Sequence, residues 1–320
     1  MTLVKRIAGK AMWHLSNRSL LARSALRDLG LRIKPGWIGP AVAYIPFSGK
    51  PLLLTSIHEN YLTFQLFWYG WTFYEPETAR FLKEIAPSLT VFVDVGSNIG
   101  FLSLVAGLTN PGLRCFSFEP NPKLYRILVE NAQINEAPIT AENVAVSCGT
   151  GTRALYLANS DMSASLESDF SGEAVRSECS TQTVTLDDYF GSEKYRDLDL
   201  SNGVLKIDVE GHEESVLQGA RATLAKHGPE IILEVLKPFS EECEAGLKML
   251  GYRFFHMTTS GFRESSHLVP NKQDRYILFN MFLTRKRSQE DLDRVFAAYA
   301  GSLASTDFAS TSILTRPEAE

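Results

Sequence analysis

The stretch of residues 91–104 constrains the fold of this chain more than any other part of the sequence. It opens as a short apolar run, residues 91–95, which only Asp94 interrupts. Gly96 and Gly100 then break the run, and apolar residues resume after the second glycine at helical spacing. This order predicts a strand, a glycine turn and a helix, which together begin a β-α-β unit. Such a turn presents backbone N–H groups and a helix N-terminus to a ligand.

An acidic residue after the next apolar run indicates which ligand the glycine turn binds. Glu119 stands 19 residues after Gly100, at the end of a second apolar run, and an acid there can accept hydrogen bonds from ribose hydroxyls. A dinucleotide-binding turn would carry a bare glycine where Asn98 stands, so that a pyrophosphate could approach. Asn98 and the acidic Asp94 therefore favour a sulfonium ligand with an α-amino group. A turn that only packs strand on helix is the alternative.

Several further motifs follow this turn in a fixed order. Together the set resembles the FkbM family of S-adenosylmethionine-dependent methyltransferases, and the resemblance covers about residues 70–283. The motifs are Gly70-Trp-Thr-Phe-Tyr-Glu-Pro76, Asp94-Val-Gly-Ser-Asn-Ile-Gly100, Phe118-Glu-Pro120, Asn143-Val-Ala-Val-Ser147, Leu205-Lys-Ile-Asp-Val-Glu-Gly211 and Glu213-Glu-Ser-Val-Leu-Gln-Gly-Ala220.

The resemblance implies a fold and an activity. The fold is α/β, the class I methyltransferase (Rossmann-like) seven-stranded sheet, here with an N-terminal helical and β extension. The activity is O-methylation of a hydroxyl of a saccharide, glycolipid or secondary metabolite, with S-adenosyl-L-methionine as the cofactor. We assign to the acceptor pocket Tyr74, Glu75 and Glu210, and to the cofactor Asp94, Gly96, Ser97, Asn98, Gly100, Phe101, Glu119, Pro120, Asn121, Asn143, Ala145 and Asp208.

The stretch 204–209 supplies the candidates for catalysis. Asp208 falls at the carboxyl end of this predicted strand, where ligands bind in open α/β sheets. We expect Asp208 to position the reactants and His212 to take the proton, because the histidine pKa lies near working pH. A solvent-facing His212 is the alternative. Lys206 lies deeper and is expected to pair a buried carboxylate such as Asp94 or Glu234.

A metal site is a further use for these groups. Asp208, His212 and Glu234 could converge at neighbouring strand ends, and oxygen-rich sites suit magnesium. The spacing matches no recognised metal signature, so we predict no metal.

Composition excludes several classes of protein. The chain has 320 residues, of which 44% are hydrophobic and 22% charged, as in ordinary globular proteins. A net charge of −5 gives no overall attraction to nucleic acid. The four cysteines form no C-x-x-C pair, which indicates reduced thiols in a cytoplasmic protein. The sequence has neither an apolar run long enough to span a membrane nor a clear signal peptide.

Charge and aromatic content divide the chain into three predicted parts. These are an extension over 1–83, a cofactor-binding domain over 84–284, and a C-terminal helix with a polar tail over 285–320. The first 34 residues hold eight basic side chains and one acidic one on a helical pattern. They could form helices docked on the domain, or residues 1–30 could contact an anionic membrane as a peripheral anchor. The aromatic stretch 61–71 is either core or a lid over the acceptor.

Periodicity and turn residues predict the remaining elements. We expect a hairpin across residues 47–51 and strands at 139–146, 150–158 and 181–185, with a loop or insertion over 159–180 between the last two. A single helix is expected from 212 to 224, and the last two strands at 252–257 and 275–284. The oligomeric state stays open.

Two other functions remain possible at this stage. One is a nucleotide-sugar or NAD-linked oxidoreductase on a Rossmann sheet, against which Asn98 and the lack of a Tyr-x-x-x-Lys pair argue. The other is a non-catalytic module that binds the cofactor without turnover.

Overall fold

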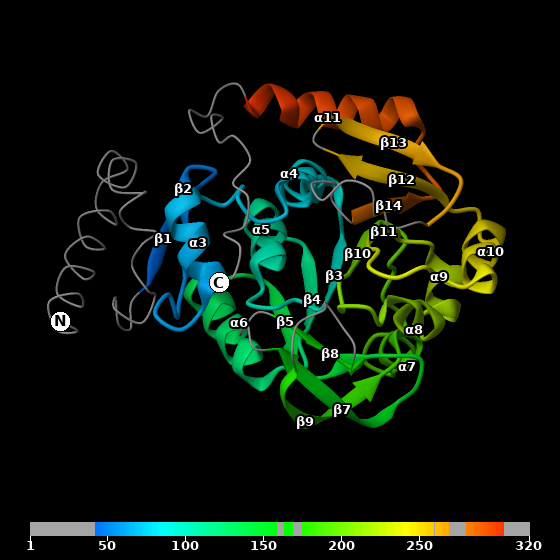
Figure 1. The fold of residues 1–320 in the computed structure, drawn as a ribbon. Coiled ribbons are helices and arrows are strands. Elements are labelled where there is room, and N and C mark those ends of the chain that lie inside the picture. Colours follow the sequence, from blue (N-terminus) through cyan, green and yellow to red (C-terminus); the bar gives the residue numbers. More distant parts are fainter. Residues whose placement is uncertain (1–41, 159–162, 169–174, 259, 269–279, 304–320) are drawn as a thin grey trace, which may run out of the picture.

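A large mixed β-sheet forms the centre of the molecule (Figure 1). The computed structural model describes residues 42–158, 163–168, 175–258, 260–268 and 280–303. In the described residues this sheet has eight strands, in the order β13-β12-β14-β11-β10-β3-β4-β5. They are β3 (Val91–Val95), β4 (Arg114–Phe118), β5 (Ile139–Glu142), β10 (Gly203–Ile207), β11 (Glu230–Glu234), β12 (Arg253–Thr258), β13 (Gly261–Ser265) and β14 (Asn280–Thr284).

The strand order matches the sequence prediction of a class I methyltransferase sheet. Five neighbouring strands, from β5 to β11, are parallel, and β14 and β12 then join antiparallel to their neighbours. The eighth strand, β13, is an addition at the edge that the sequence did not predict, and it pairs only with β12. The strands β3 and β10 are parallel neighbours, but the order in which the chain adds strands to the sheet reverses between them, so their carboxyl ends open a crevice for a ligand.

Helices cover both faces of this sheet. One face carries α3 (Tyr61–Tyr69), α4 (Pro76–Ile85), α5 (Phe101–Thr109), α6 (Pro122–Ile134) and α11 (Gln289–Leu303), and the other carries α7 (Leu186–Gly191), α8 (Glu213–Gln218), α9 (Arg221–His227) and α10 (Glu241–Met249). Successive side chains of a strand point to opposite faces. Hence Phe92 and Val204 pack with the first group of helices, and Val93 and Leu205 with the second.

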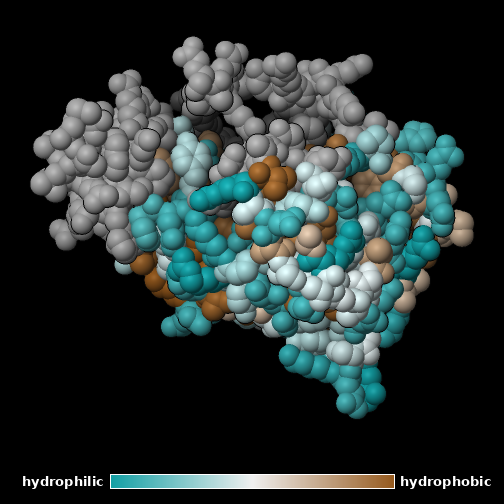
Figure 2. Space-filling view, turned by 60° about the horizontal axis from the view of Figure 1, so that its bottom comes forward, coloured by the Kyte–Doolittle hydropathy of each residue, from teal (hydrophilic) through white to brown (hydrophobic). Residues whose placement is uncertain are grey.

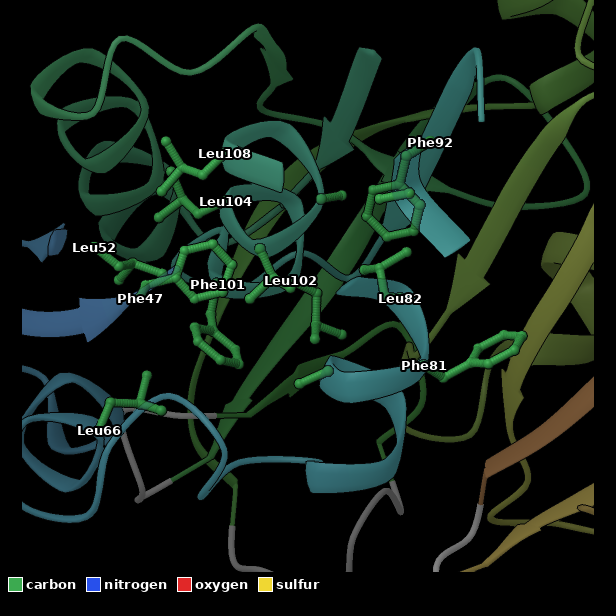
Figure 3. Close-up of a cluster of buried hydrophobic side chains, with 14 of the residues drawn as sticks. Phe47, Leu52, Leu66, Phe81, Leu82, Phe92, Phe101, Leu102, Leu104 and Leu108 are labelled. Carbon is green, nitrogen blue, oxygen red and sulfur yellow. The ribbon is translucent and has the colours of Figure 1, made fainter. Parts of the chain in front are cut away.

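The N-terminal hairpin packs into the same core as the cofactor domain. Strands β1 (Ala43–Phe47) and β2 (Lys50–Leu54) form the predicted hairpin, and Phe47 and Leu52 point toward the buried side chain of Phe101 on α5 (Figure 3). The aromatic stretch after it is the helix α3, whose Phe64, Phe67 and Trp68 are buried, as the core interpretation expects. The division proposed at residue 83 is therefore not marked by a separate core.

Two asparagines, one in α6 and one at its C-cap, tie this hairpin to the domain. The buried Asn131 accepts hydrogen bonds at Oδ1 from the backbone N–H of Thr55 and donates from Nδ2 to the carbonyl of Ile99. Asn135 makes paired hydrogen bonds with the backbone of Leu53, as a neighbouring strand would. The hairpin is thus bonded through α6 to the glycine turn.

A second sheet replaces part of the predicted third strand and of the predicted loop. The expected strand over 139–146 is broken: β5 ends at Glu142, and β6 (Ala145–Val146) leaves the large sheet to pair with β9 (Val175–Val184). The strands β7 (Gly151–Ala158) and β8 (Ala164–Ser165) complete this four-stranded sheet. The expected loop over 159–180 was therefore wrong at 164–165 and 175–180, because long antiparallel pairing with β7 extends β9 toward the N-terminus.

The helix predicted over residues 212–224 is two helices. It breaks at Gly219 because the chain there lies against Ser147, so closely that a Cβ atom would stand 2.1 Å from the Ser147 carbonyl oxygen. The side chain of Asp187 then accepts hydrogen bonds from the N–H groups of Ala222 and Thr223 and caps α9 from outside.

Other predictions fall partly or wholly outside the described residues. These are the basic helices and membrane contact of residues 1–34, the polar tail after 303 and the first part of the last strand, 275–279. All four cysteines are free thiols. In the described ranges no helix is long and apolar enough to cross a membrane. Figure 2 shows one mainly hydrophilic face, on which hydrophobic residues form separate patches.

Candidate active site

The glycine turn after β3 reverses the chain through three left-handed residues. Gly96, Asn98 and Gly100 have φ angles of 83°, 52° and 79°. Asparagine tolerates this conformation better than other residues with a Cβ atom, which explains how it replaces the glycine of a dinucleotide turn. The hydroxyl of Ser97 donates to the carbonyl of Asp94 at 2.7 Å and closes the turn. The turn then delivers the chain to α5 at Phe101.

Glu119 is held beside this turn by two backbone hydrogen bonds. Its Oε2 accepts from the N–H of Asn98 and its Oε1 from the N–H of Asn121, both at 2.8 Å. Burial raises the pKa of Glu119 to about 8, although the two N–H groups oppose this shift. The carboxyl group is thus fixed in one orientation, with lone pairs left for a ligand.

One pocket runs along the carboxyl ends of the parallel strands. It extends from β4 past β3 and β10 to β11, and residues of β6 and β8 close its other side. Ten of the sixteen predicted site residues line it: Tyr74, Glu75, Gly96, Asn98, Glu119, Pro120, Ala145, Asp208, Glu210 and His212. The structure therefore brings the predicted cofactor, acceptor and catalytic residues to a single cavity.

The other six predicted residues support the pocket from behind and do not line it. Asp94 points into the α5 face, where Ser103 donates to its Oδ2 at 2.6 Å, and burial raises its pKa to about 6. Asn121 caps α6, and Asn143 donates to the carbonyl of Glu119. The remaining three belong to the glycine turn or to the core beneath it: Ser97, Gly100 and Phe101.

The part of the pocket next to β10 and β11 has carboxyl groups around one lysine. The ammonium group of Lys206 lies 2.8 Å from Oδ2 of Asp208 and 3.4 Å from Oε1 of Glu75. Lys206 thus pairs carboxylates, as expected, but its nearest partners are Asp208 and Glu75 and not the two examples that we named, Asp94 and Glu234. Glu75 comes from the N-terminal side, where it has a left-handed φ of 41° at the start of α4. This backbone turn places the carboxylate of Glu75 next to β10, within 3.4 Å of the Lys206 ammonium group.

His212 is buried and bonded at both ring nitrogens. Nδ1 lies 2.7 Å from Oε1 of Glu167, and Nε2 lies 2.9 Å from the hydroxyl of Ser147. A carboxylate can only accept, so Nδ1 carries the proton and Nε2 accepts from Ser147. Burial lowers the pKa of His212, and nearby Arg153 lowers it further, while Glu167 acts in the opposite direction. The solvent-facing alternative for His212 is therefore wrong: the ring is neutral and lines the pocket.

Local backbone geometry explains why His212 turns inward. Glu210 and Gly211 follow β10 with φ angles of 55° and 97°, which reverse the chain at once. The carboxylate of Glu213 accepts from the N–H of Gly211 at 2.7 Å and fixes this turn. His212 then lies at the N-cap of α8, facing the second sheet.

Two residues of the site were given no role from the sequence, and a third, Glu234, was named only as a possible metal ligand or partner of Lys206. Glu234 stands at the carboxyl end of a buried strand and lines the pocket. Ser147 was quoted in a motif but given no role. Glu167 carries no sequence signal, because only the pairing of β8 with β7 brings its neighbourhood to His212.

Comparison with known proteins identifies the family. The family model described as the methyltransferase FkbM domain matches residues 94–260, which is more than half of the chain. This chain belongs to the FkbM methyltransferase family. The match includes the glycine turn, Glu119, Asp208 and His212.

Two curated relatives and one solved structure are similar to this FkbM protein. The methyltransferase sdnD of Sordaria araneosa is 30% identical over 42% of this chain and 61% of its own length. The hexuronic acid methyltransferase AglP of Haloferax volcanii is 30% identical over 45% of this chain and 56% of its own length. The chain thus spans less than two thirds of either relative. The FkbM methyltransferase structure from Methylobacillus flagellatus KT is 18% identical, with a TM-score of 0.38, over 61% of this chain and 44% of that one.

S-adenosylmethionine is the cofactor of this FkbM protein, as the sequence predicted, and the residues of the pocket fit it. Glu119 offers the lone pairs of a fixed carboxyl group to ribose hydroxyls, and the acidic side chains of the pocket suit a cationic sulfonium and ammonium. Among the described residues no group of three or more His, Cys, Asp or Glu side chains is arranged to hold a metal ion.

Proposed function

We propose that this FkbM methyltransferase transfers the methyl group of S-adenosylmethionine to a hydroxyl oxygen of a saccharide, glycolipid or related secondary metabolite. The observation that carries the proposal is the neutral, buried His212 on the wall of the pocket that Glu119 and Gly96 also line. A hydroxyl needs a base as the new carbon–oxygen bond forms, and a neutral imidazole is a suitable one. The name of the relative AglP, a hexuronic acid methyltransferase, supports a sugar-like acceptor.

The roles of the pocket residues follow from their places along the sheet. At the β4 and β3 end, Glu119, Gly96 and Asn98 hold the cofactor, which supplies the reactive methyl carbon when bound. At the β10 and β11 end, Tyr74, Glu75 and Glu210 contact the acceptor. Asp208 lies between the two ends and positions the reactants.

His212 accepts the acceptor proton at Nε2 in this proposal. The Glu167 carboxylate keeps the proton of the ring on Nδ1, so the lone pair of Nε2 is available once the Ser147 hydroxyl turns away. Positioning of the reactants contributes about 7–11 kcal/mol at best, and a base adds roughly 10²–10⁴-fold.

Calorimetry tests the cofactor part of the proposal, and labelled cofactor tests the reaction. We expect the protein to bind S-adenosylmethionine and S-adenosylhomocysteine but not NAD. Neutral glycans incubated with cofactor carrying an isotopically labelled methyl group should then yield labelled methyl ethers. Binding of NAD alone would favour the oxidoreductase alternative, and cofactor binding without label transfer to any acceptor would favour a non-catalytic module.

Variants separate the two catalytic residues. His212→Ala should lower kcat by roughly 10²-fold or more and leave the affinity for S-adenosylhomocysteine intact. Asp208→Asn should damage both, because Asp208 faces cofactor and acceptor. A His212→Ala enzyme with the wild-type kcat across pH 6–9 would place the base elsewhere.

A further inference from the structure

A single buried ammonium group lies behind the acceptor end of the pocket. Lys206 is 1% exposed and does not line the pocket, whereas Asp208, Glu75 and Glu234 beside it do. Its Nζ is within 3.4 Å of two of these carboxylates, Asp208 and Glu75. Any effect of Lys206 on a bound molecule must therefore pass through the carboxyl groups that separate it from the cavity.

Both carboxylates that Lys206 contacts are also fixed from a second side. Oε2 of Glu75 accepts from Nδ2 of Asn280 at 2.7 Å, and the same amide nitrogen donates to the hydroxyl of Thr78. Asp208 shares a hydrogen bond with Glu234 at the end of the neighbouring strand. Glu75 adopts its left-handed backbone directly before Pro76, a strained arrangement for a residue with a side chain. The fold thus brings three carboxyl groups together around one ammonium group. Glu75 comes from the start of α4, and Asp208 and Glu234 come from the ends of β10 and β11.

This one charge opposes the effect of burial on the pKa of Asp208. Burial would raise the pKa of Asp208, but Lys206 lowers it overall. Burial and the charge of Asp208 raise the pKa of Glu234, so Glu234 keeps its proton and donates a hydrogen bond to Asp208. Without the ammonium, neighbouring buried carboxylates would repel each other and take up protons. The ammonium therefore maintains a defined set of hydrogen-bond acceptors on the pocket wall.

We propose that Lys206 is the resident cation of the acceptor site, holding the carboxylates of Asp208 and Glu75 in place and aimed into the pocket. This is the task that a bound divalent ion performs in oxygen-rich sites. The inference rests on the proposed methyl transfer only for its assignment of this end of the pocket to the acceptor. Lys206 is a positioning residue in this scheme, because it acts through Asp208 and Glu75.

Replacing the ammonium by a metal ion tests the proposal without measuring activity. Lys206→Ala opens a space among three carboxyl groups, where Mn²⁺ should bind and raise the melting temperature. Lys206→Met is the matched control, because it fills the space without a charge and should gain no response to Mn²⁺. Lys206→Ala combined with Asp208→Asn removes one ligand and should lose the response again. Wild-type protein should show no shift with Mn²⁺, because the lysine occupies the site.

A folded Lys206→Ala protein whose melting temperature and Mn²⁺ affinity equal those of wild type would overturn the proposal. A response to Mn²⁺ that survives Asp208→Asn would also overturn it, since the ion would then be bound elsewhere. These outcomes do not depend on methyl transfer, so they stay readable if the acceptor assignment fails.

Kinetics provide a second test that does not need Lys206→Ala to fold. Lys206→Arg keeps the charge and should retain far more methyl transfer than Lys206→Met, which should lose on the order of 10²-fold in kcat/KM for the acceptor. S-adenosylhomocysteine should still bind both variants, because Glu119 and Gly96 lie at the other end of the pocket. Equal loss of methyl transfer in the two variants would show that the charge is not what matters.

Discussion

Gly96 packs so closely on Asp208 that a Cβ atom at position 96 would lie 1.7 Å from the carbonyl oxygen of Asp208. The backbone of Gly96 is also left-handed, with a φ of 83°. Next to this contact, the N–H of Asp208 donates to the carbonyl of Val95 at 3.0 Å. The glycine turn after β3 and the acidic motif after β10 are thus packed together as one unit on the wall of the pocket.

Gly96→Ala should therefore damage stability and cofactor binding together. The left-handed backbone alone costs about 1–3 kcal/mol for a residue with a side chain, and the contact with Asp208 adds to this. Thermal denaturation and calorimetry with S-adenosylhomocysteine measure the two effects. Gly149→Ala is the control, because no atom lies within 4 Å of a Cβ atom at that position. If Gly96→Ala behaved like this control, the close contact would not exist in solution.

The pKa of Glu119 predicts how stability changes with pH. Burial raises this pKa to about 8 in the folded protein, from a usual value of 4.5. The folded state therefore holds a proton that the unfolded state has released, so Glu119 makes the protein less stable as pH rises from about 4.5 to 8. In Glu119→Gln the side chain is an amide, which does not titrate in this pH range. The free energy of unfolding of this variant, measured with urea, should fall less over this range than that of wild type, and parallel curves would contradict the raised pKa.

The sequence predicted the central sheet well because its signals are local. Each of the strands β3, β4, β10 and β11 is a short apolar run next to a glycine or an acid. The strands β3 and β10 begin and end within two residues of the limits predicted for them, 91–95 and 204–209. The residues that end these strands fall at one edge of a parallel sheet, so most of the pocket followed directly.

What the sequence did not predict depends on contacts between distant segments. The break of the predicted helix at Gly219 requires Ser147, which lies on another element, and the cap from Asp187 comes from a third. The same holds for Lys206, because its partner Glu75 is far away in the chain and reaches it through an unusual backbone angle. No periodicity or spacing encodes such pairs.

Asn131 links the N-terminal hairpin to the glycine turn, and its loss should affect both. Asn131→Ala leaves the buried N–H of Thr55 and the carbonyl of Ile99 without their partner, at about 1–3 kcal/mol for each unsatisfied group. We expect a lower melting temperature and weaker binding of S-adenosylhomocysteine, because Ile99 belongs to the turn. Gln133→Ala, on the exposed face of the same helix, should change neither. Unchanged cofactor affinity in a destabilised Asn131→Ala protein would show that the turn does not depend on the hairpin.

Glu167 should set the pH at which His212 becomes an effective base. The Glu167 carboxylate accepts from Nδ1 of His212 at 2.7 Å and works against the burial that lowers the pKa of the ring. In Glu167→Gln that opposition is gone, so the pKa of His212 falls further. A base acts only when it is unprotonated, so the rising limb of kcat against pH should move to lower pH.

The size of kcat should change as well, because the amide of Glu167→Gln can donate as well as accept and no longer keeps the proton of the ring on Nδ1. We expect a lower plateau of kcat together with the shift of the limb, while the affinity for S-adenosylhomocysteine stays the same. Glu178→Gln, on the exposed strand β9, provides the matched control and should leave the profile unchanged. A purely structural role for Glu167 would lower kcat equally at every pH, and that result would argue against His212 as the base.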